Sequence, residues 1–423
     1  MPSKALQRKG IFYEDMPKSS IIFIKIENIK IAMEKTFKYR LYPSKKQINI
    51  LNQVLNSCRY LYNSMLEYER YIYEKDIKFA NKIELNNLLT DLKIINPSLK
   101  SIHSQILQNV NDRVIKSFNG FFNRVKIGQK AGYPRFKNIH RYNSFTFPQS
   151  GFKFTSEKRI KLSKIGEIPI KIHRIIKGTI KTLTIEKTPT NKWFSCFSSH
   201  IDITPPERKS EKIVGLDLGL EKFAVLSDGS EIENPRWLKQ SLDKLRLKSR
   251  QLSRKKKGSS NRFKSRLKLA RLYEKVSNQR VDFLHKLTLR LVKEYDCIAL
   301  EDLQVSSMNN KYLQFSINDV SWDKFRQLLT YKAENAGCKL DFVNPKDTSK
   351  KCSKCGRLQD MPLSKRMYVC SCGNSMSRDL NSAFVILSHS LFHRHTEGTS
   401  GINACGDAPI GASAKQEAIS SNL

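Results

Sequence analysis

The sequence predicts a multidomain α/β protein with a small cysteine-rich module inserted in it. Hydrophobic strand-like segments at 213–218 and 296–303 carry or end in acidic residues, as buried strands of α/β sheets often do. Apolar residues recur at helical spacing through much of the first third of the chain. Four of the nine cysteines are crowded into residues 352–372. A chain of 423 residues is long enough for about two or three domains.

The charge of the chain narrows the class of partner. Lys and Arg total 76 against 39 Asp and Glu, which gives a formal charge of +37 and a pI near 9.9. Such a surface attracts polyanions, so nucleic acid is the expected partner. A membrane is not expected, because no run of about 18 apolar residues is present to span one. Without a visible export signal, and with cysteines clustered as for a metal, we expect a cytoplasmic, prokaryotic protein associated with the nucleoid when bound to DNA.

The N-terminal half is expected to form one unit. Residues 1–33 read as an appendage, with Met33 as a possible native start. Residues 34–150 are expected to be mostly helical, because apolar residues recur at helical spacing in two sets, namely Ile48, Leu51, Leu55, Tyr62, Leu66 and Ile106, Val110, Val114, Phe118, Phe122. The segments SFTFPQ, GFKFT, KTLTIEKT and WFSCFSSHID alternate like antiparallel strands. We therefore expect a helical bundle plus antiparallel β segments over 34–210, closed by the polar linker PPERKS.

Residues 236–286 form a segment of a different kind. They contain 18 Lys or Arg against three acids, a net charge of 18 − 3 = +15, and apolar residues recur at helical spacing. Two long basic helices joined near 255–261 are predicted. Solvated surface helices would explain the pattern, but so much like charge is self-repulsive unless phosphates neutralise it.

Three acids are candidates for a catalytic site. Ile213–Leu218 and Phe223–Leu226 are predicted as two short strands around a turn, where Gly219 would let the backbone turn close to the site. Asp217 lies in the apolar run IVGLDLG, where a buried carboxylate needs a partner or a cation. Glu301 ends the strand-like segment DCIALEDL, and Asp379 starts an apolar helix in SRDLNSAFVIL. Each acid has an ordinary explanation as well, since strands often end in acids and Asp is a good helix N-cap.

As a set, the acids suggest metal-dependent phosphodiester cleavage. Such cleavage uses carboxylates to hold two divalent cations about 4 Å apart. Mg²⁺ prefers hard oxygen ligands and keeps several waters, so about three carboxylates suffice. An Asp on a first strand, a Glu on a later strand and an Asp on a helix is the ribonuclease H-like arrangement. We therefore predict Asp217, Glu301 and Asp379 as ligands of Mg²⁺ or Mn²⁺.

The cysteine cluster predicts a structural zinc site. Cys352 and Cys355 form a C-x2-C pair, and Cys370 and Cys372 form a C-x-C pair fourteen residues later. Four thiolates in two close pairs can surround Zn²⁺ tetrahedrally, and a four-thiolate site leaves no open position for catalysis.

The ordered motifs resemble those of the TnpB family, insertion-sequence proteins related to type V CRISPR nucleases. The resemblance includes KYRLYPSKKQ, CRYLYN, GYPRFK, RLKLARLYEKVSNQRVDFLHKL, GLDLG, LVKEYDCIALEDL, YKAENAGCKL, TSKKCSKCG, MSRDLNSA and GTSGINACGD. It covers nearly everything after Met33. The chain departs from the family at Ser377, where many members carry an additional Asp, and in its C-x-C second pair.

The resemblance implies an RNA-guided DNA endonuclease. A recognition lobe of helices and a β-barrel would occupy 34–210, and a RuvC-like nuclease would occupy 211–348 and 377–390, with the basic insert 236–286. The zinc ribbon would be 349–376, and 391–423 would be a flexible tail. Asp217, Glu301 and Asp379 would be the RuvC acids. The implied partners are a guide RNA from the element's end and a double-stranded DNA target, held by backbone and shape.

Several basic and aromatic residues are weaker candidates for nucleic-acid contact. In the basic segment they are Arg254, Lys255, Lys256, Lys257, Arg262, Lys264 and Arg266. In the N-terminal part they are Tyr133, Arg135 and Phe136, with Tyr60 and Tyr62 as further aromatics that could equally be core residues.

Other functions fit part of the pattern. A regulator that binds nucleic acid without cutting would look nearly identical, except that the acid set is complete here. A conventional transposase also uses three acids, but the cysteine module between the second and third acid favours RuvC. An actin-like ATPase can share GLDLG, yet no second phosphate loop accompanies it.

Overall fold

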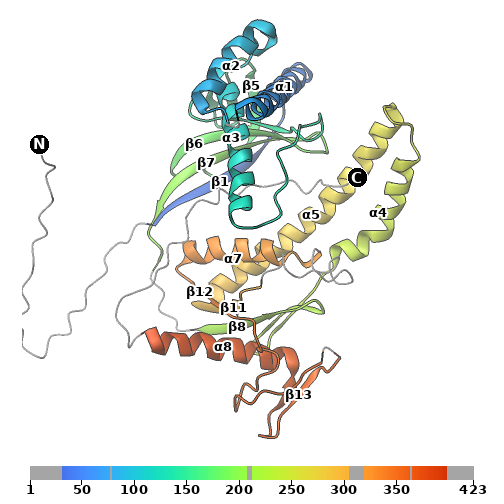
Figure 1. Ribbon diagram of the computed structural model, residues 1–423. Helices are drawn as coiled ribbons and strands as arrows, with labels where there is room; N and C mark the ends of the chain where they lie inside the picture. Colours follow the sequence, from blue (N-terminus) through green and yellow to red (C-terminus); the bar gives the residue numbers. More distant parts are fainter. Residues whose placement is uncertain (1–30, 77–78, 207–211, 304–318, 363, 398–423) are drawn as a thin grey trace, which may run out of the picture.

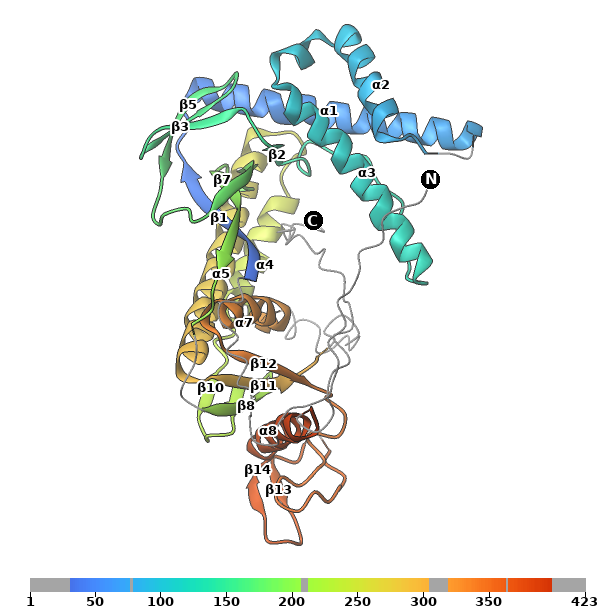
Figure 2. The ribbon, with the colours of Figure 1, turned by 90° about the vertical axis from the view of Figure 1, so that its left-hand side faces the viewer.

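The computed structural model describes residues 31–76, 79–206, 212–303, 319–362 and 364–397. In this part of the chain two bodies are stacked one above the other, and the long helix α5 runs between them (Figures 1 and 2). Each body has its own hydrophobic core, one built from residues 37–201 and the other from residues 214–338. The predicted appendage up to residue 30 and the predicted tail from residue 398 lie outside the described residues. No described helix is both long and apolar enough to cross a membrane.

The upper body contains an antiparallel seven-stranded sheet in the order β2-β6-β7-β1-β5-β4-β3. Its strands are β1 (Ile31–Leu41), β2 (Ser144–Phe147), β3 (Phe152–Ser156), β4 (Arg159–Leu162), β5 (Gly166–Lys171), β6 (Thr179–Lys187) and β7 (Trp193–Ile203). The four sequence segments predicted as antiparallel strands are confirmed as β2, β3, β6 and β7. Among the described strands, the edge strands β2 and β3 are not hydrogen-bonded to each other, so backbone pairing does not close the predicted barrel. The Phe147 and Phe152 rings meet there instead, with centroids 6.3 Å apart.

Three helices cover this sheet and share its core. They are α1 (Lys45–Asp76), α2 (Lys82–Ile95) and α3 (Ser104–Lys126), with a short 3-10 turn at Pro97–Ser101. The predicted apolar faces are confirmed for residues such as Leu51 and Leu66 of α1 and Val114 of α3, which are buried, whereas Phe122 is 39% exposed. The segment expected to be mostly helical begins with a strand, however, because β1 pairs along its whole length with β7, from Ile31 opposite Ile203 to Leu41 opposite Trp193.

The lower body is built on a five-stranded mixed sheet in the order β10-β9-β8-β11-β12. The strands are β8 (Ile213–Leu218), β9 (Lys222–Leu226), β10 (Glu231–Glu233), β11 (Cys297–Glu301) and β12 (Lys339–Val343). β8, β11 and β12 are parallel, whereas β9 is antiparallel to both β8 and β10. The two strands expected around Gly219 and the buried strand expected before Glu301 are confirmed.

Helices cover both faces of this sheet (Figure 1). On one face, Ile298 and Leu300 pack in a core with α5 (Ser260–Glu294) and α7 (Trp322–Ala336). On the other face, Ala299 packs with Ile386 of α8 (Arg378–Glu397). This alternation along β11 is the period of two that a strand imposes.

The predicted pair of basic helices is confirmed as α4 (Trp237–Ser253) and α5. α5 is 35 residues long and is buried at its C-terminal end in the lower core. Nearer the middle of α5, Glu274 accepts hydrogen bonds from Lys192 Nζ at 2.8 Å and from Thr190 Oγ1 at 3.1 Å. Both donors lie in the β6–β7 turn of the upper body. α5 therefore links the two bodies directly.

The start of α4 is capped by a residue distant in sequence. The buried Asp319 accepts backbone hydrogen bonds from Leu238 and Lys239 at 3.1 and 3.2 Å, and it pairs with Arg280 of α5 at 2.7 Å. A carboxylate at a helix N-terminus satisfies free N–H groups and interacts favourably with the helix dipole. Asp319 thus fixes the basic helix pair to the segment that begins α7.

The cysteine-rich module follows β12 and hangs below α8 (Figure 2). It contains the two-stranded hairpin of β13 (Met367–Val369) and β14 (Ser375–Ser377), which leads straight into α8. α8 continues to Glu397, seven residues past the predicted boundary at 390. The sequence explains this length, because no glycine or proline interrupts it before Gly398.

Candidate active site and cysteine cluster

Asp217 lies next to the end of β8, where Val225 of β9 is its antiparallel partner. Burial raises the pKa of its carboxyl well above the ordinary value, and the negative charges of Glu301 and Asp379 raise it further. Arg378 opposes the shift. Ionising a carboxyl group in this apolar strand is therefore costly, as predicted, and Glu301 and Asp379 increase the cost of ionising Asp217.

Glu301 lies beside Asp217 because of the sheet register. β8 and β11 are parallel, with Leu300 opposite Leu216, so the next residue on each strand is Glu301 and Asp217. Laterally paired residues point to the same face of a sheet. Thr348, in the loop after β12, donates a hydrogen bond to the Glu301 carboxylate. Burial raises the pKa of Glu301, and this hydrogen bond lowers it in part.

Asp379 lies in the first turn of α8 but does not cap the helix. The cap is Ser377, whose Oγ accepts a hydrogen bond from the Leu380 N–H at 3.3 Å. Asp379 instead receives hydrogen bonds from Arg378 Nε and Nη2, both at 3.2 Å. The ordinary explanation of Asp379 as an N-cap is therefore wrong. Ser377 stands where many members of the TnpB family carry Asp. The helix still has a good N-cap there, because Ser and Asp cap helices about equally well.

The three acids converge without closing on one ion. Asp217 interacts electrostatically with both others. Among the described residues, however, the four cysteines are the single group of metal-ligating side chains close enough together to hold one ion. The acids offer hard oxygen ligands and three carboxyl groups, against which Arg378 supplies one nearby cation. This donor set fits Mg²⁺ or Mn²⁺.

Gly215 is a residue of this site that motif reading missed. A Cβ atom on Gly215 would lie 2.2 Å from the Ala383 carbonyl oxygen and 2.8 Å from the Leu387 nitrogen, both in the α8 backbone. β8 and α8 can therefore approach closely only with glycine at this position. The close approach brings the helix that carries Asp379 against the strand that carries Asp217. Gly219, which was expected to matter, lies in the β8–β9 turn, where a Cβ would be 2.9 Å from the Lys222 oxygen.

The four predicted zinc ligands are gathered as expected. Their sulfur atoms all lie within 4.8 Å of one another. Cys352 and Cys372 sulfurs are 3.7 Å apart, and those of Cys355 and Cys370 are 3.6 Å apart. A tetrahedral zinc site with bonds of about 2.3 Å places sulfurs roughly 3.8 Å apart. The cluster therefore fits zinc in both ligand type and spacing.

The thiols of this cluster do not ionise alike. Burial raises the pKa of Cys352, but hydrogen bonds from the backbone of Cys355 and Lys354 and from the Asn374 amide outweigh it, so its pKa is lowered. The backbone N–H of Asn374 lowers the pKa of Cys372, yet burial and the neighbouring thiols raise it overall to about 11. Four thiolates crowded together need a cation to ionise together, as zinc binding requires.

The basic residues predicted for nucleic-acid contact fall into two groups. Arg254, Lys255, Lys256, Lys257 and Lys264 are exposed at or near the α4–α5 turn. Arg262 instead donates to the carbonyls of Leu252 and Lys255 at 3.0 and 2.9 Å, so it holds the turn together. Arg266 is exposed, and its guanidinium is 2.8 Å from the His140 ring of the upper body.

The aromatic candidates near residue 133 surround an arginine. Arg70 of α1 lies over the rings of Tyr133 and Phe136, at 5.2 and 4.7 Å from the centroids. Tyr133 packs edge-on against Phe118, while Phe136 and Arg135 remain exposed. Of the two other aromatics, Tyr62 is buried and Tyr60 is 38% exposed. Phe136 and Arg135 are thus the members of this loop that a nucleic acid could reach.

A further basic cluster, not predicted, lies where the two bodies meet. Burial lowers the pKa of Lys35 in β1, and Arg174 and Lys177 of the β5–β6 loop lower it further. Burial also lowers the pKa of Lys332 in α7 to about 8. Lys332 and Arg174 in turn help to lower the pKa of His285. These cations come from separate parts of the sequence, so no local charge run marked them.

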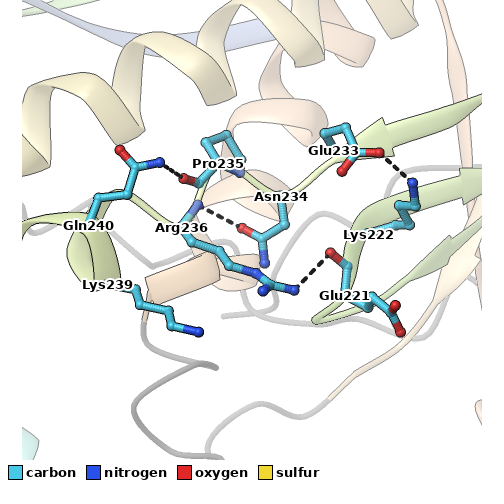
Figure 3. Close-up of a pocket in the computed structure, with 8 residues that line it drawn as sticks. All are labelled: Glu221, Lys222, Glu233, Asn234, Pro235, Arg236, Lys239 and Gln240. Carbon is cyan, nitrogen blue, oxygen red and sulfur yellow. Dashed lines mark hydrogen bonds and ion pairs between the residues drawn. The ribbon is translucent and has the colours of Figure 1, made fainter.

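A cavity of about 580 Å³ lies apart from the three acids, at the start of α4 (Figure 3). Most of its charged groups are already paired: Lys222 with Glu231 and Glu233, Glu221 with Arg366, and Arg236 with the carbonyls of Leu220 and Glu221. Figure 3 shows the pairs of Lys222 with Glu233 and of Arg236 with the Glu221 carbonyl. We therefore do not assign the catalytic chemistry to this cavity.

Comparisons with protein-family models match three parts of the chain. Residues 185–311 match a model described as "Probable transposase" (OrfB_IS605), and residues 322–386 match "Cas12f1-like, TNB domain". Residues 33–78 match a model described as a helix-turn-helix domain, although in the present structure the described part of this range forms β1 and α1.

Two curated relatives resemble nearly the whole chain. A Streptomyces pristinaespiralis protein named "Putative RNA-guided DNA endonuclease" is 30% identical over 384 residues, which cover 89% of this chain and 92% of the relative. The Escherichia coli K12 protein "Putative RNA-guided DNA endonuclease InsQ" is 30% identical over 374 residues, covering 84% and 91%.

A solved structure shares the fold. It is entitled "Cryo-EM structure of the Cas12f1-sgRNA-target DNA complex" and aligns with a TM-score of 0.55 at 15% identity. The alignment covers 84% of this chain and 98% of the other. At this identity the likeness concerns the arrangement of the backbone alone.

Proposed function

This chain belongs to the TnpB family of insertion-sequence proteins, and from that premise we propose that it is an RNA-guided DNA endonuclease. Two relatives of near full length carry the name of that activity. The observation that carries the proposal within this chain is the convergence of Asp217, Glu301 and Asp379 from two strands and a helix. A non-cleaving protein would have no need of two further acids that raise the cost of ionising Asp217.

The sheet supports a ribonuclease H-like, RuvC-type nuclease. The order β10-β9-β8-β11-β12, with β9 antiparallel and the central strands parallel, is the one expected for that fold. In this arrangement the first and fourth strands are neighbours, which brings Asp217 and Glu301 together although 84 residues separate them (301 − 217). The helix after the last strand supplies the third acid.

Each residue of the site would have a defined role. The carboxylates of Asp217, Glu301 and Asp379 would hold Mg²⁺, or Mn²⁺ in its place. When bound, the metal pair would supply an activated water and stabilise the leaving oxygen of the phosphodiester. Thr348 would hold the Glu301 carboxylate in place, and Arg378 would limit the repulsion around Asp379. The cysteine cluster would hold zinc and have a structural role.

The partners we propose are a guide RNA from the element's end and a double-stranded DNA target on the nucleoid. The formal charge of +37 and the exposed lysines of the α4–α5 turn favour a polyanion. The cations around Lys35, Arg174 and Lys332 support a phosphate backbone running past the joint between the two bodies. Sequence would then be read by base pairing with the guide, while the protein contacts the backbone.

The proposal is tested with the protein purified together with RNA transcribed from its element's end. We expect Mg²⁺-dependent cleavage of a plasmid that matches the guide, under at least one flanking sequence from a randomised library. A plasmid with a scrambled target is the control and should stay intact. Binding of the matched plasmid without cleavage under every flanking sequence would instead identify a regulator, and cleavage independent of the guide would identify a conventional nuclease or transposase.

A further inference from the structure

A buried amide side chain of helix α8 holds the start of the cysteine module. Asn381 is fully buried, and its Oδ1 accepts a hydrogen bond from the Ser353 N–H at 3.0 Å. Its Nδ2 donates to the Lys351 carbonyl at 2.8 Å. Ser353 and Lys351 flank Cys352, so Asn381 is hydrogen-bonded to the backbone on both sides of the first cysteine.

A second buried amide extends this contact to the sulfur itself. Asn374, which is 6% exposed, donates through Nδ2 toward Asn381 Oδ1 at 3.2 Å and toward Cys352 Sγ at 3.4 Å. The Cys370 N–H also donates to the Asn374 carbonyl at 2.8 Å. The hydrogen bonds therefore form a continuous path from two of the cysteines to α8.

This path ends close to the third acid. Asn381 follows Asp379 by two residues, which on a helix is a rotation of about 200°, so the two side chains point to nearly opposite sides. One side of the first turns thus contacts the cysteine module, and the other faces Asp217. The contact with Gly215 prevents α8 from moving closer to β8. A rotation of α8 that released Asn381 would therefore also turn Asp379 away from Asp217.

We propose that Asn381 is a positioning residue that couples zinc at the cysteine cluster to metal affinity at the three acids. With zinc bound, the segment 351–353 is fixed, and Asn381 holds α8 in the rotation that presents Asp379. With the cysteine cluster empty, the segment loosens and the acids bind their cation more weakly. This inference rests on the proposed acid site and goes beyond it, because it gives the zinc site a role in setting the catalytic one.

The chemistry at residue 381 explains why an amide is needed. The site requires one acceptor for the N–H groups of Ser353 and Asn374, and one donor for the Lys351 carbonyl. Aspartate would supply the acceptor but not the donor, and it would add a negative charge beside the thiolates. Outer hydrogen-bond partners of metal ligands typically change metal affinity by about 10–100-fold when they are removed.

The test measures Mn²⁺ binding to the full-length protein without nucleic acid, by electron paramagnetic resonance, together with zinc content. We expect Asn381→Ala to keep about one zinc per chain and to weaken Mn²⁺ binding roughly tenfold, which is a typical size for coupling between two sites. Asn381→Asp, which keeps the volume of the side chain but loses the donor and adds a buried negative charge, should show a loss at least as large. Ser388→Ala is the matched control, because among the described residues its hydroxyl donates within α8, to the Val385 carbonyl.

Zinc removal supplies the second arm of the experiment. Cys355→Ser should lose zinc and weaken Mn²⁺ binding by a similar factor, and the double variant with Asn381→Ala should be no weaker than either alone. Independent, multiplying effects would overturn the coupling. So would Mn²⁺ affinity within twofold of wild type in Asn381→Ala and Asn381→Asp.

Asp217→Asn separates this inference from the proposed function. If Asp217→Asn binds Mn²⁺ as well as wild type, the acids are not the metal site and both proposals fail. If Asp217→Asn abolishes binding while the Asn381 variants leave it unchanged, the acid site stands and only the coupling fails.

Discussion

At the scale of single residues, the Asp217 carboxyl group lies in an apolar strand and has two other acidic side chains near it. Its raised pKa means that the ionised carboxylate costs stability in the protein without metal. At pH values between the ordinary pKa of 3.8 and the raised pKa, the Asp217 carboxyl is protonated in the native state and ionised in the unfolded chain. Stability from this group is therefore present at low pH and is lost as pH rises through the raised pKa.

The first prediction concerns Asp217→Asn in buffer without divalent cations. At pH 7.5 the variant should melt several degrees above wild type, because it removes the cost of ionisation while keeping the shape of the side chain. The difference should shrink as pH falls toward 4. Millimolar Mg²⁺ should stabilise wild type and not the variant. Thermal melting at several pH values measures this, and a variant less stable than wild type at pH 7.5 would refute it.

The second prediction concerns Gly215. A methyl group there would overlap the α8 backbone at Ala383, so Gly215→Ala should destabilise the protein by about 3 kcal/mol or more. Gly132→Ala is the control, since a Cβ at Gly132 meets nothing within 4 Å and should change stability by less than about 1 kcal/mol. Urea denaturation compares the two. Equal effects would show that β8 and α8 can separate freely.

The residues of the site were predictable to different degrees. Asp217, Glu301 and Asp379 could be selected because their residue types suit a metal and their positions suit strands and a helix. Gly215 and Asn381 could not, because their roles depend on the backbone of a helix more than 160 residues away and on a loop around Cys352. A glycine or an asparagine in a motif does not reveal which segment it will touch.

At the scale of elements, the basic pair α4 and α5 shows how one charge run divides into different roles. Lys255, Lys256 and Lys257 are exposed in the turn, whereas Arg262 binds the carbonyls that end α4. Composition predicted the helices and their joint, because helical spacing and Gly258 are local signals. Composition could not show that Arg262 binds carbonyl groups within the turn whereas the three lysines stay exposed to a partner.

The third prediction follows from that division. Replacing Lys255, Lys256 and Lys257 by alanine should weaken DNA or RNA binding. The slope of the logarithm of the binding constant against the logarithm of the salt concentration should become shallower, by up to about 0.9 for each phosphate that the variant no longer neutralises. Stability should hardly change. Arg262→Ala should instead lower the melting temperature and alter the salt slope little. Filter binding at several salt concentrations checks both, and a salt slope unchanged in the lysine variant would contradict the assignment.

Tertiary context overrode local reading in two elements. The stretch around Tyr39 and Leu41 was included in a mostly helical segment, yet it forms β1, because pairing with β7 and β5 satisfies its backbone and buries both side chains. The β segments were expected to close a barrel, but closure depends on pairing between β2 and β3. That pairing cannot be read from alternation, which is a property of each strand alone.

At the scale of the whole molecule, the architecture brings distant segments to one place. The strand order places β8 beside β11, and α8 crosses the same sheet from the opposite face to α5 and α7. The upper body, the basic helices and the lower body are then joined by Glu274 with Lys192 and by Asp319 with Arg280. A polyanion held between these parts would contact both bodies at once, which suits a guide paired with its target.

The central claim is that the lower body cuts DNA with Asp217, Glu301 and Asp379, and two adjacent carboxylates offer the most direct test. Glu301 faces Asp217, whereas the next residue, Asp302, pairs with Arg326 of α7. The measurement is the rate of guided, Mg²⁺-dependent plasmid cleavage by Glu301→Gln and Asp302→Asn, with guide and target binding measured alongside. The account predicts background cleavage with intact binding for Glu301→Gln, and a rate within several-fold of wild type for Asp302→Asn. Near-normal cleavage by Glu301→Gln would contradict it.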